Sequence, residues 1–172
     1  MTTTGPGPSR AVEVTVGFDV NGEPRRLSVR SDARLLDVLR DEFGLDSVRD
    51  ACSVGMCGAC TVIVDGVAVS GCLTLAALCD GSRVSTAEGL AEDGESDAVV
   101  TAWTRMRAFQ CSYCTPGYVV ALSALLSSNP NPTHQQLVTW LSGHLCRCGS
   151  YARILAAAEM AIAERHPAAE SS

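Results

Sequence analysis

The residues of this 172-residue chain that are best able to do chemistry are its nine cysteines, eight of which fall into two groups. The first group comprises Cys52, Cys57, Cys60 and Cys72. A C-x4-C-x2-C triplet with one distant fourth thiolate is the plant-type spacing for a 2Fe–2S cluster. A loop around an anionic cluster must also aim backbone N–H groups at the sulfurs, and Gly55 and Gly58 can supply the positive φ that this requires. A zinc loop is the alternative, although zinc sites normally pair two short hairpins.

The second group joins two short motifs that lie far apart in the sequence. It comprises Cys111, Cys114, Cys146 and Cys148. Each pair lies immediately before a predicted helix, so two helix N-termini would converge on one centre and present free N–H groups to an anionic cluster. Because C-x-C is uncommon in structural zinc sites, the set favours a second 2Fe–2S cluster over a four-cysteine zinc site.

The elements that carry the first group are predicted to form a small sheet with one helix. Apolar residues alternate on both sides of Asn21-Gly22, a strong two-residue hairpin signal. From Asp32 the period changes to that of a helix, which Ser31 or Asp32 can cap and Gly44 can end. Strands are expected at 12–18, at 27–29, at 61–64, up to residue 70 after an Asp65-Gly66 turn, and at 83–85.

Everything after residue 97 is predicted to be helical. The acidic stretch 88–97, which contains two glycines, is typical of a linker. Thr115 with Pro116 predicts an N-cap followed by proline at the first helical position, and Thr133 with Gln136 forms a capping-box pattern. The helices are expected at 99–107, from 115 to 126, at 133–141 and at 151–165. Four short helices imply a small bundle.

Composition limits the partners and the location of the chain. Its net charge of −6 and pI near 5.0 argue against nucleic acid and against an anionic membrane surface. No charged segment followed by an apolar segment begins the chain, and no apolar run approaches the ~18 residues of a transmembrane helix. Thiols held by metal in a reducing cytoplasm are therefore expected, rather than a secreted disulfide scaffold.

These motifs together resemble the small iron–sulfur subunit of the molybdenum hydroxylases, the family of xanthine dehydrogenase, aldehyde oxidoreductase and aerobic carbon monoxide dehydrogenase. The first cysteine loop carries the resemblance, with Gln-Cys-Ser-Tyr-Cys-Thr-Pro-Gly at 110–117 and Ser-Gly-His-Leu-Cys-Arg-Cys at 142–148, and it spans 11–165. The chain departs from the family at Ser53-Val54-Gly55, where Gly-Glu-Gly is usual, and at His144, where Asn is usual. After Cys148 it has Gly-Ser-Tyr where Thr-Gly-Tyr is usual.

The resemblance implies an α+β fold. An N-terminal plant-type ferredoxin β-grasp domain (11–87) would be followed by a linker (88–97) and by a C-terminal four-helix iron–sulfur bundle (98–166). Residues 1–10, which are rich in Gly, Pro, Thr and Ser, and residues 167–172 are expected to be disordered tails.

The resemblance also implies a division of labour between subunits. A large subunit would hold molybdenum with molybdopterin cytosine dinucleotide and a medium subunit would hold FAD, in a heterotrimer or a dimer of heterotrimers. Electrons would pass from molybdenum through the cluster of the second cysteine group and then through that of the first group to FAD. Gln110 and Cys148 match positions that touch the pterin in the family.

Two other functions are compatible with parts of the pattern. One is a free-standing two-cluster ferredoxin-type carrier, and the other is a zinc-stapled interaction module without a redox role. Cys79 has no spaced partner and is expected to be a small buried apolar residue. His144 is expected to be an interface loop residue or a donor to a sulfur, and Arg147 could offset cluster charge or pair with a partner's anionic group.

Overall fold

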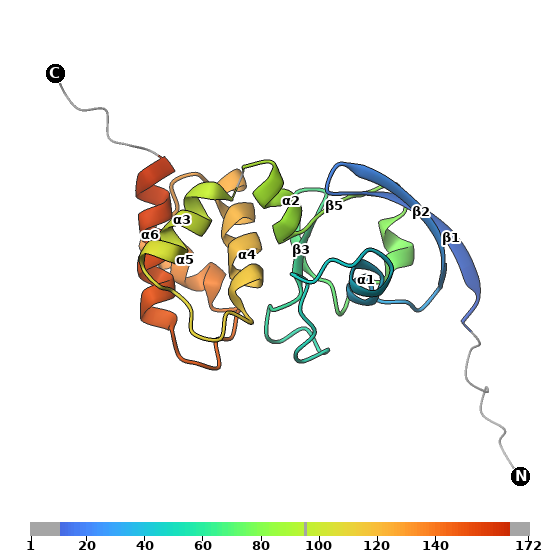
Figure 1. The fold of residues 1–172 in the computed structure, drawn as a ribbon, viewed down its shortest axis with the longest axis horizontal. Coiled ribbons are helices and arrows are strands. Elements are labelled where there is room, and N and C mark those ends of the chain that lie inside the picture. Colours follow the sequence, from blue (N-terminus) through green and yellow to red (C-terminus); the bar gives the residue numbers. More distant parts are fainter. Residues whose placement is uncertain (1–10, 95, 166–172) are drawn as a thin grey trace, which may run out of the picture.

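The computed structural model describes residues 11–94 and 96–165, so the tails expected at 1–10 and 167–172 lie outside the described residues. A five-stranded sheet with short helical segments lies at one end of the molecule, and a group of helices lies at the other (Figure 1). This arrangement confirms the predicted α+β class.

The sheet has the strand order β2-β1-β5-β3-β4. β1 (Glu13–Val20) pairs with β2 (Glu23–Arg30) in an antiparallel hairpin, and β3 (Thr61–Val64) pairs in the same way with β4 (Val67–Ser70). β5 (Arg83–Ser85) runs parallel to β1 and antiparallel to β3. Both tight turns are confirmed, since Asn21, Gly22, Asp65 and Gly66 all have positive φ, between 48° and 84°.

A short helical segment covers one face of the sheet. α1 (Leu35–Asp37) continues into a π-helical turn, η1 (Val38–Glu42), and a second turn, η2 (Ala76–Cys79), follows β4. Leu35, Leu36 and Leu39 are fully buried in the sheet core.

The predicted capping of this segment is wrong at its start and confirmed at its end. Arg34 is the N-cap residue and makes no side-chain cap. Asp32 binds the Arg30 guanidinium at 2.8 and 2.9 Å instead, because that charged partner lies two residues away on the end of β2. Gly44 takes a φ of +68° just after the turn, as a C-terminal stop requires.

The second part consists of α3 (Asp97–Arg105), α4 (Thr115–Ser128), α5 (His134–Leu141) and α6 (Tyr151–Arg165). These helices share one apolar core that includes Trp103, Tyr118, Leu122 and Leu137. α4 also packs against β3 and β4, so that it is buried on nearly all sides and joins the two parts. No helix within the described ranges is both long and apolar enough to cross a membrane.

Helix starts in this part differ in one respect from the prediction. Thr133 and Gln136 form the expected capping box. Thr115, in contrast, is already the first residue of α4, and Cys114 is the N-cap. The Thr115 hydroxyl is buried without a hydrogen-bond partner among the described residues.

The stretch 88–97 is not an irregular linker, because most of it lies in or next to helices. α2 (Ala87–Glu92) occupies its first half and α3 begins at Asp97. Leu90 is buried, and α2 packs against α4. Glu88 provides an anchor: its carboxylate accepts hydrogen bonds from the Ser47 N–H at 2.8 Å and the Thr86 hydroxyl at 2.6 Å. The acidic composition suggested a solvated segment, but Glu88 and Leu90 face the protein.

Candidate iron–sulfur centres

The first cysteine loop follows η1 and leads into β3. Ser53, Gly55 and Gly58 have φ values of 55°, 75° and 70°, which confirms that the loop needs left-handed backbone at both predicted glycines. This conformation turns backbone N–H groups towards sulfur. A hydrogen bond from the Val54 N–H is the main reason why the pKa of the Cys52 thiol falls to about 6. The backbone of the loop by itself therefore stabilises the thiolate of Cys52.

A hairpin brings the other two cysteines of this group together. Thr61 pairs with Ser70 at the open end of the β3–β4 hairpin, so Cys60 and Cys72 lie just beyond the last pair. The Gly71 N–H donates to the Cys60 carbonyl oxygen at 3.1 Å and extends the ladder by one bond. Both thiols are buried, and burial raises the pKa of Cys60 to about 12.

The second group is held by the starts of two helices. Cys114 is the N-cap of α4, and Cys148 lies three residues before Tyr151, the first residue of α6. The Ser150 N–H donates to the Cys146 sulfur at 3.4 Å. A hydrogen bond from the Tyr113 N–H is the main cause that lowers the pKa of the exposed Cys111 thiol. Burial raises the pKa of Cys114 to about 12.

The eight thiols interact in pairs. Direct thiol–thiol interactions contribute to the pKa shifts of Cys52 and Cys57, which act on each other, of Cys60, on which Cys72 acts, of Cys111, on which Cys148 acts, and of Cys114 and Cys146, which act on each other. Within 11–94 and 96–165, no three Cys, His, Asp or Glu side chains gather as they would around a single metal ion. Two pairs of thiols are what a two-iron centre requires, because each iron takes two thiolates.

The two cysteine groups lie next to each other. Their loops and the starts of α4 and α6 share one side of the molecule (Figure 1). The Leu145 N–H donates to the Cys57 carbonyl oxygen at 3.0 Å, and the Tyr113 hydroxyl donates to the Asp50 carbonyl oxygen at 2.5 Å. A cavity of about 530 Å³ is lined by cysteines of both groups: Cys52 and Cys57 of the first, and Cys111, Cys114 and Cys146 of the second.

Gly117 lets the first turn of α4 approach the first loop. A Cβ at this position would lie 2.3 Å from the Gly58 carbonyl oxygen and 3.2 Å from the Ala59 Cα. Gly58 is restricted as well, because a Cβ there would lie 2.3 Å from the His144 ring. Only glycine at both positions allows the two cysteine groups to come this close.

Gln110, which the resemblance implicates in pterin contact, lies beside the C-x-C motif. Its amide Nε2 donates to the Cys148 carbonyl oxygen at 3.1 Å and to the Ser150 hydroxyl at 3.4 Å. The two residues singled out for that contact are thus brought together by the fold.

The remaining candidates take different positions. Cys79 is fully buried in the sheet core, where its thiol lies 3.8 Å from the Leu75 carbonyl oxygen, outside both groups. Arg147 is exposed and lines the 530 Å³ cavity. Among the described residues His144 makes no hydrogen bond to a sulfur, and its Nε2 lies 3.0 Å from the Thr61 hydroxyl. Burial lowers the pKa of His144 to about 4, so the ring is neutral.

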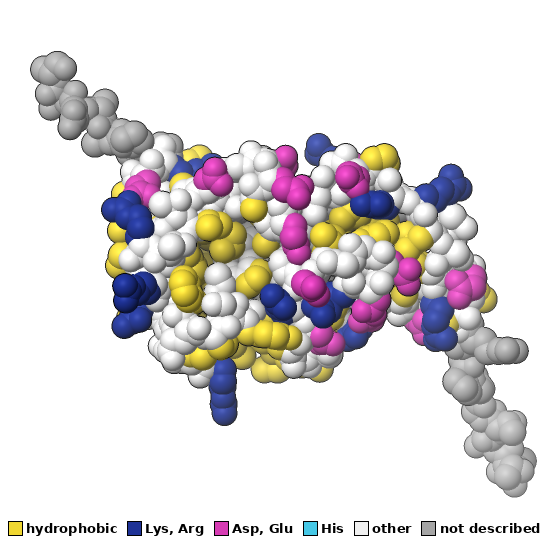
Figure 2. Space-filling view, viewed as in Figure 1, with side chains coloured by type: hydrophobic (Ala, Val, Ile, Leu, Met, Phe, Trp, Pro, Cys, Tyr) yellow, Lys and Arg dark blue, Asp and Glu magenta, His cyan; other side chains and the backbone are white. Residues whose placement is uncertain are grey.

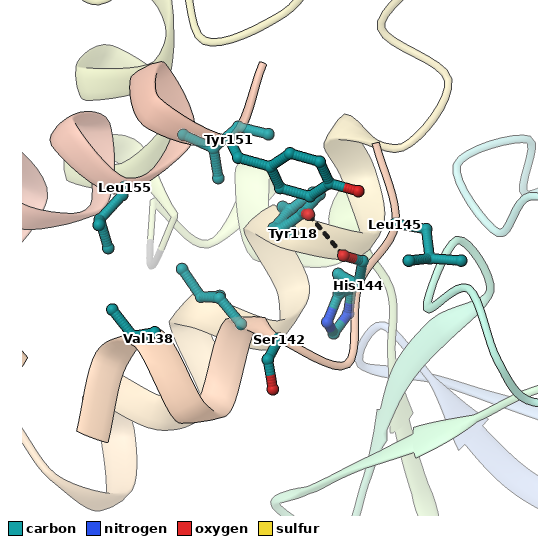
Figure 3. A pocket seen from close by; sticks show the side chains of 9 residues that line it. Tyr118, Val138, Ser142, His144, Leu145, Tyr151 and Leu155 are labelled. Carbon is teal, nitrogen blue, oxygen red and sulfur yellow. Dashed lines mark hydrogen bonds between the residues drawn. The ribbon is translucent and has the colours of Figure 1, made fainter. Parts of the chain in front are cut away.

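An apolar pocket of about 310 Å³ adjoins His144 (Figure 3). Its walls come from α4, α5, α6 and the loop before the C-x-C motif, and the Tyr118 hydroxyl donates to the His144 carbonyl oxygen at 2.7 Å across it.

In Figure 2, apolar side chains form a broken patch over the helical part, whereas most acidic side chains lie over the junction and the sheet.

Sequence reasoning missed the polar groups that connect the cysteine loops. The Tyr113 hydroxyl binds the Asp50 carbonyl oxygen, and Thr61 binds His144. The Tyr151 hydroxyl accepts from the Cys146 N–H at 3.0 Å and so holds the segment just before its own helix. Tyr113 lies between Cys111 and Cys114, Thr61 directly follows Cys60, and Tyr151 lies three residues after Cys148. That position was an available signal, but it did not specify the partner.

Known proteins agree with this geometry. Residues 18–90 match the model for a "2Fe-2S iron-sulfur cluster binding domain", and residues 86–159 match that for a "[2Fe-2S] binding domain". The chain is 44% identical over 150 residues to the nicotinate dehydrogenase small FeS subunit of Eubacterium barkeri, a match that covers 87% of this chain and 96% of the relative.

Two solved structures have the same fold. Quinoline 2-oxidoreductase from Pseudomonas putida 86 aligns with a TM-score of 0.80 and 32% identity, over 95% of this chain and 100% of that chain. The aldehyde oxidoreductase from Desulfovibrio desulfuricans aligns with a TM-score of 0.82 and 36% identity, over 89% of this chain and 17% of that chain. The chain belongs to the small 2Fe–2S electron-transfer subunits of the molybdenum hydroxylase family.

Proposed function

We propose that the eight paired cysteines are the ligands of two 2Fe–2S clusters. Cys52 and Cys57 would share one iron of the first cluster and Cys60 and Cys72 the other. Cys111 with Cys148, and Cys114 with Cys146, would do the same in the second cluster. The pairing of the thiols and the N–H groups turned towards Cys52, Cys111 and Cys146 support this assignment. Such clusters, when bound, accept and release one electron at a time.

The protein holds the two cluster sites in place and controls how much water reaches each of them. Burial of Cys60 and Cys72 keeps water away from one side of the first site, while Cys111 leaves the second site open to solvent or to a partner. Hydrogen bonds to sulfur and burial are the means by which a protein adjusts a cluster potential. The different surroundings of the two sites support two different potentials.

The observation that carries the proposal is the hydrogen bond from the Leu145 N–H to the Cys57 carbonyl oxygen. Leu145 precedes the ligand Cys146, so this one bond connects a proposed ligand of one cluster with the neighbour of a proposed ligand of the other. Electrons would enter at the second site and leave from the first.

Membership of the family supports a proposal for the partner subunits. We propose that a large subunit presents molybdopterin cytosine dinucleotide to Gln110 and Cys148, and that a medium subunit presents FAD near the first cluster. The complex would be a heterotrimer or a dimer of heterotrimers in the cytoplasm, where free thiols persist. The proposal also treats 11–87 as the β-grasp domain and 98–166 as a four-helix iron–sulfur bundle.

The first experiment measures iron, zinc and acid-labile sulfide in the complex purified from its host. We expect about four iron and four sulfide per copy of this chain. Zinc without sulfide would instead identify a stapled interaction module, and a fully loaded, monomeric chain without partners would identify a free-standing carrier. Nicotinate, quinoline and an aldehyde, the compounds named for the relatives, then serve as probe substrates.

A second experiment tests the ligand assignment. Cys148→Ser should remove or alter the second cluster and abolish turnover with an acceptor that draws electrons from flavin. Cys79→Ser is the matched control and should keep the full iron content. Full turnover of the Cys148→Ser complex with that acceptor would refute the assignment.

A further inference from the structure

His144 lies where the two cysteine groups meet. It is two residues before Cys146, and its ring packs against Gly58, in the first cysteine loop. The ring also stacks at a tilt on Tyr118 of α4, with a centroid distance of 5.1 Å. One side chain therefore touches the first loop and α4 while belonging to the second loop.

The hydrogen bonds of the ring have a defined direction. The Thr61 hydroxyl donates to the Gly58 carbonyl oxygen at 2.7 Å, so it accepts from His144 Nε2, 3.0 Å away. This assigns the proton of the neutral ring to Nε2. Nδ1 is buried and has no partner among the described residues.

The main chain at His144 is held as firmly as the ring. Its carbonyl oxygen accepts from the Tyr118 hydroxyl at 2.7 Å, its N–H donates to the Leu141 carbonyl oxygen at 3.0 Å, and the next N–H binds Cys57. Figure 3 shows the residue between Tyr118 and the loop that continues to Leu145. The main chain of His144 is therefore fixed to α4 and to the end of α5. Its ring contacts Gly58 and Thr61, which lie before and after Cys60 in the sequence.

We propose that His144 is a positioning residue for electron transfer between the two clusters, holding the first cysteine loop at a fixed distance from the second. This inference rests on the proposed function, because it requires both clusters. The contacts themselves do not depend on that function. The His144 ring donates to Thr61 and fills the space next to Gly58. A longer and more flexible side chain would lose more conformational entropy in making the same contacts.

The test uses the purified complex and four variants. His144→Ala removes the ring and the donor, and Thr61→Val removes only the acceptor, since the Thr61 N–H still satisfies the Gly58 carbonyl oxygen at 3.2 Å. His144→Gln restores a donor. His134→Ala is the matched control, because His134 is exposed and bonds to Glu159, away from both cysteine groups.

The readouts are iron content, the magnetic interaction between the two reduced clusters by electron paramagnetic resonance, and the rate of electron passage between them. With iron content unchanged, His144→Ala and Thr61→Val should alter the magnetic interaction and slow the passage of electrons relative to wild type, because the distance between the two cysteine loops is no longer fixed. His144→Gln should restore part of both, and His134→Ala should match wild type.

Wild-type interaction and rate in both His144→Ala and Thr61→Val, with both clusters present, would overturn the role of His144 alone. Loss of iron from Thr61→Val would also overturn it, because the contact would then be needed for cluster retention rather than for spacing. Absence of both clusters from the wild-type complex would refute the proposed function itself, together with this inference.

Discussion

The backbone N–H of Leu145 donates a 3.0 Å hydrogen bond to the carbonyl oxygen of Cys57, and 88 positions of sequence separate the two residues. The bond connects the loop of the first cysteine group directly to the loop of the second. It involves only main-chain atoms, so its strength depends on how the loops are placed and not on the Leu145 side chain, which is half exposed.

Leu145→Pro tests that bond, since proline has no N–H to donate. We expect slower electron passage between the clusters and a loss of about 1 kcal/mol in stability, the usual net contribution of a hydrogen bond. Leu145→Ala keeps the N–H and should behave as wild type. Rapid-mixing reduction followed by electron paramagnetic resonance of frozen samples measures the rate, and an unchanged rate in a fully loaded Leu145→Pro complex would contradict the prediction.

Gly117→Ala should destabilise the junction between the two parts. Alanine would favour the helix by up to about 1 kcal/mol, but its Cβ would lie 2.3 Å from the Gly58 carbonyl oxygen, a main-chain atom that cannot move freely. We expect a net loss of roughly 1–3 kcal/mol, as for overpacking. Gly143→Ala is the control, because nothing lies within 4 Å of a Cβ there. Equal melting temperatures for the two variants would rule out the close approach.

Cys79→Ala should leave the cluster content of the complex unchanged. The thiol lies in the sheet core and outside both cysteine groups, so its removal should cost only about 1 kcal/mol of packing. Cys72→Ala, a substitution of similar size at another buried cysteine, should instead lose iron. Iron and sulfide analysis of the two variants separates these roles, and a loss of iron from Cys79→Ala would make it a ninth ligand or a structural requirement of the first site.

Glu88 should make stability depend on pH. Burial opposes ionisation of its carboxylate, but hydrogen bonds from Ser47 and Thr86 outweigh it and hold the pKa of Glu88 below its ordinary value of 4.5. A depressed pKa in the folded state means that the unfolded chain binds more protons as pH falls. The stabilisation is therefore present above pH 4.5 and is lost as pH falls through the folded-state pKa.

The comparison of wild type with Glu88→Gln measures this contribution. The melting temperature of wild type should exceed that of the variant at pH 7, and the difference should shrink below pH 4.5. Both proteins share any loss of clusters in acid, so the difference isolates the carboxylate. A difference that is constant across this range would show that Glu88 does not titrate with folding.

Much of the local structure was determined by the sequence itself. The turns at Asn21-Gly22 and Asp65-Gly66, the capping box at Thr133 and the helix end at Gly44 are interactions between residues within a few positions of each other. The cysteine spacing belongs to the same class, because a short loop with left-handed backbone at Gly55 and Gly58 presents its thiols whatever surrounds it. The family could also be identified from these motifs.

Only the tertiary structure decided how the two cysteine groups meet. Gly117 and His144 have no local reason to be what they are, since each is defined by an atom of a distant segment. The same holds for 88–97, where the local acidic composition indicated a linker and the burial of Leu90 and the hydrogen bonds of Glu88 made a helix. Local rules describe contacts between near neighbours in the chain, whereas the junction between the two sites is built from contacts between residues far apart in it.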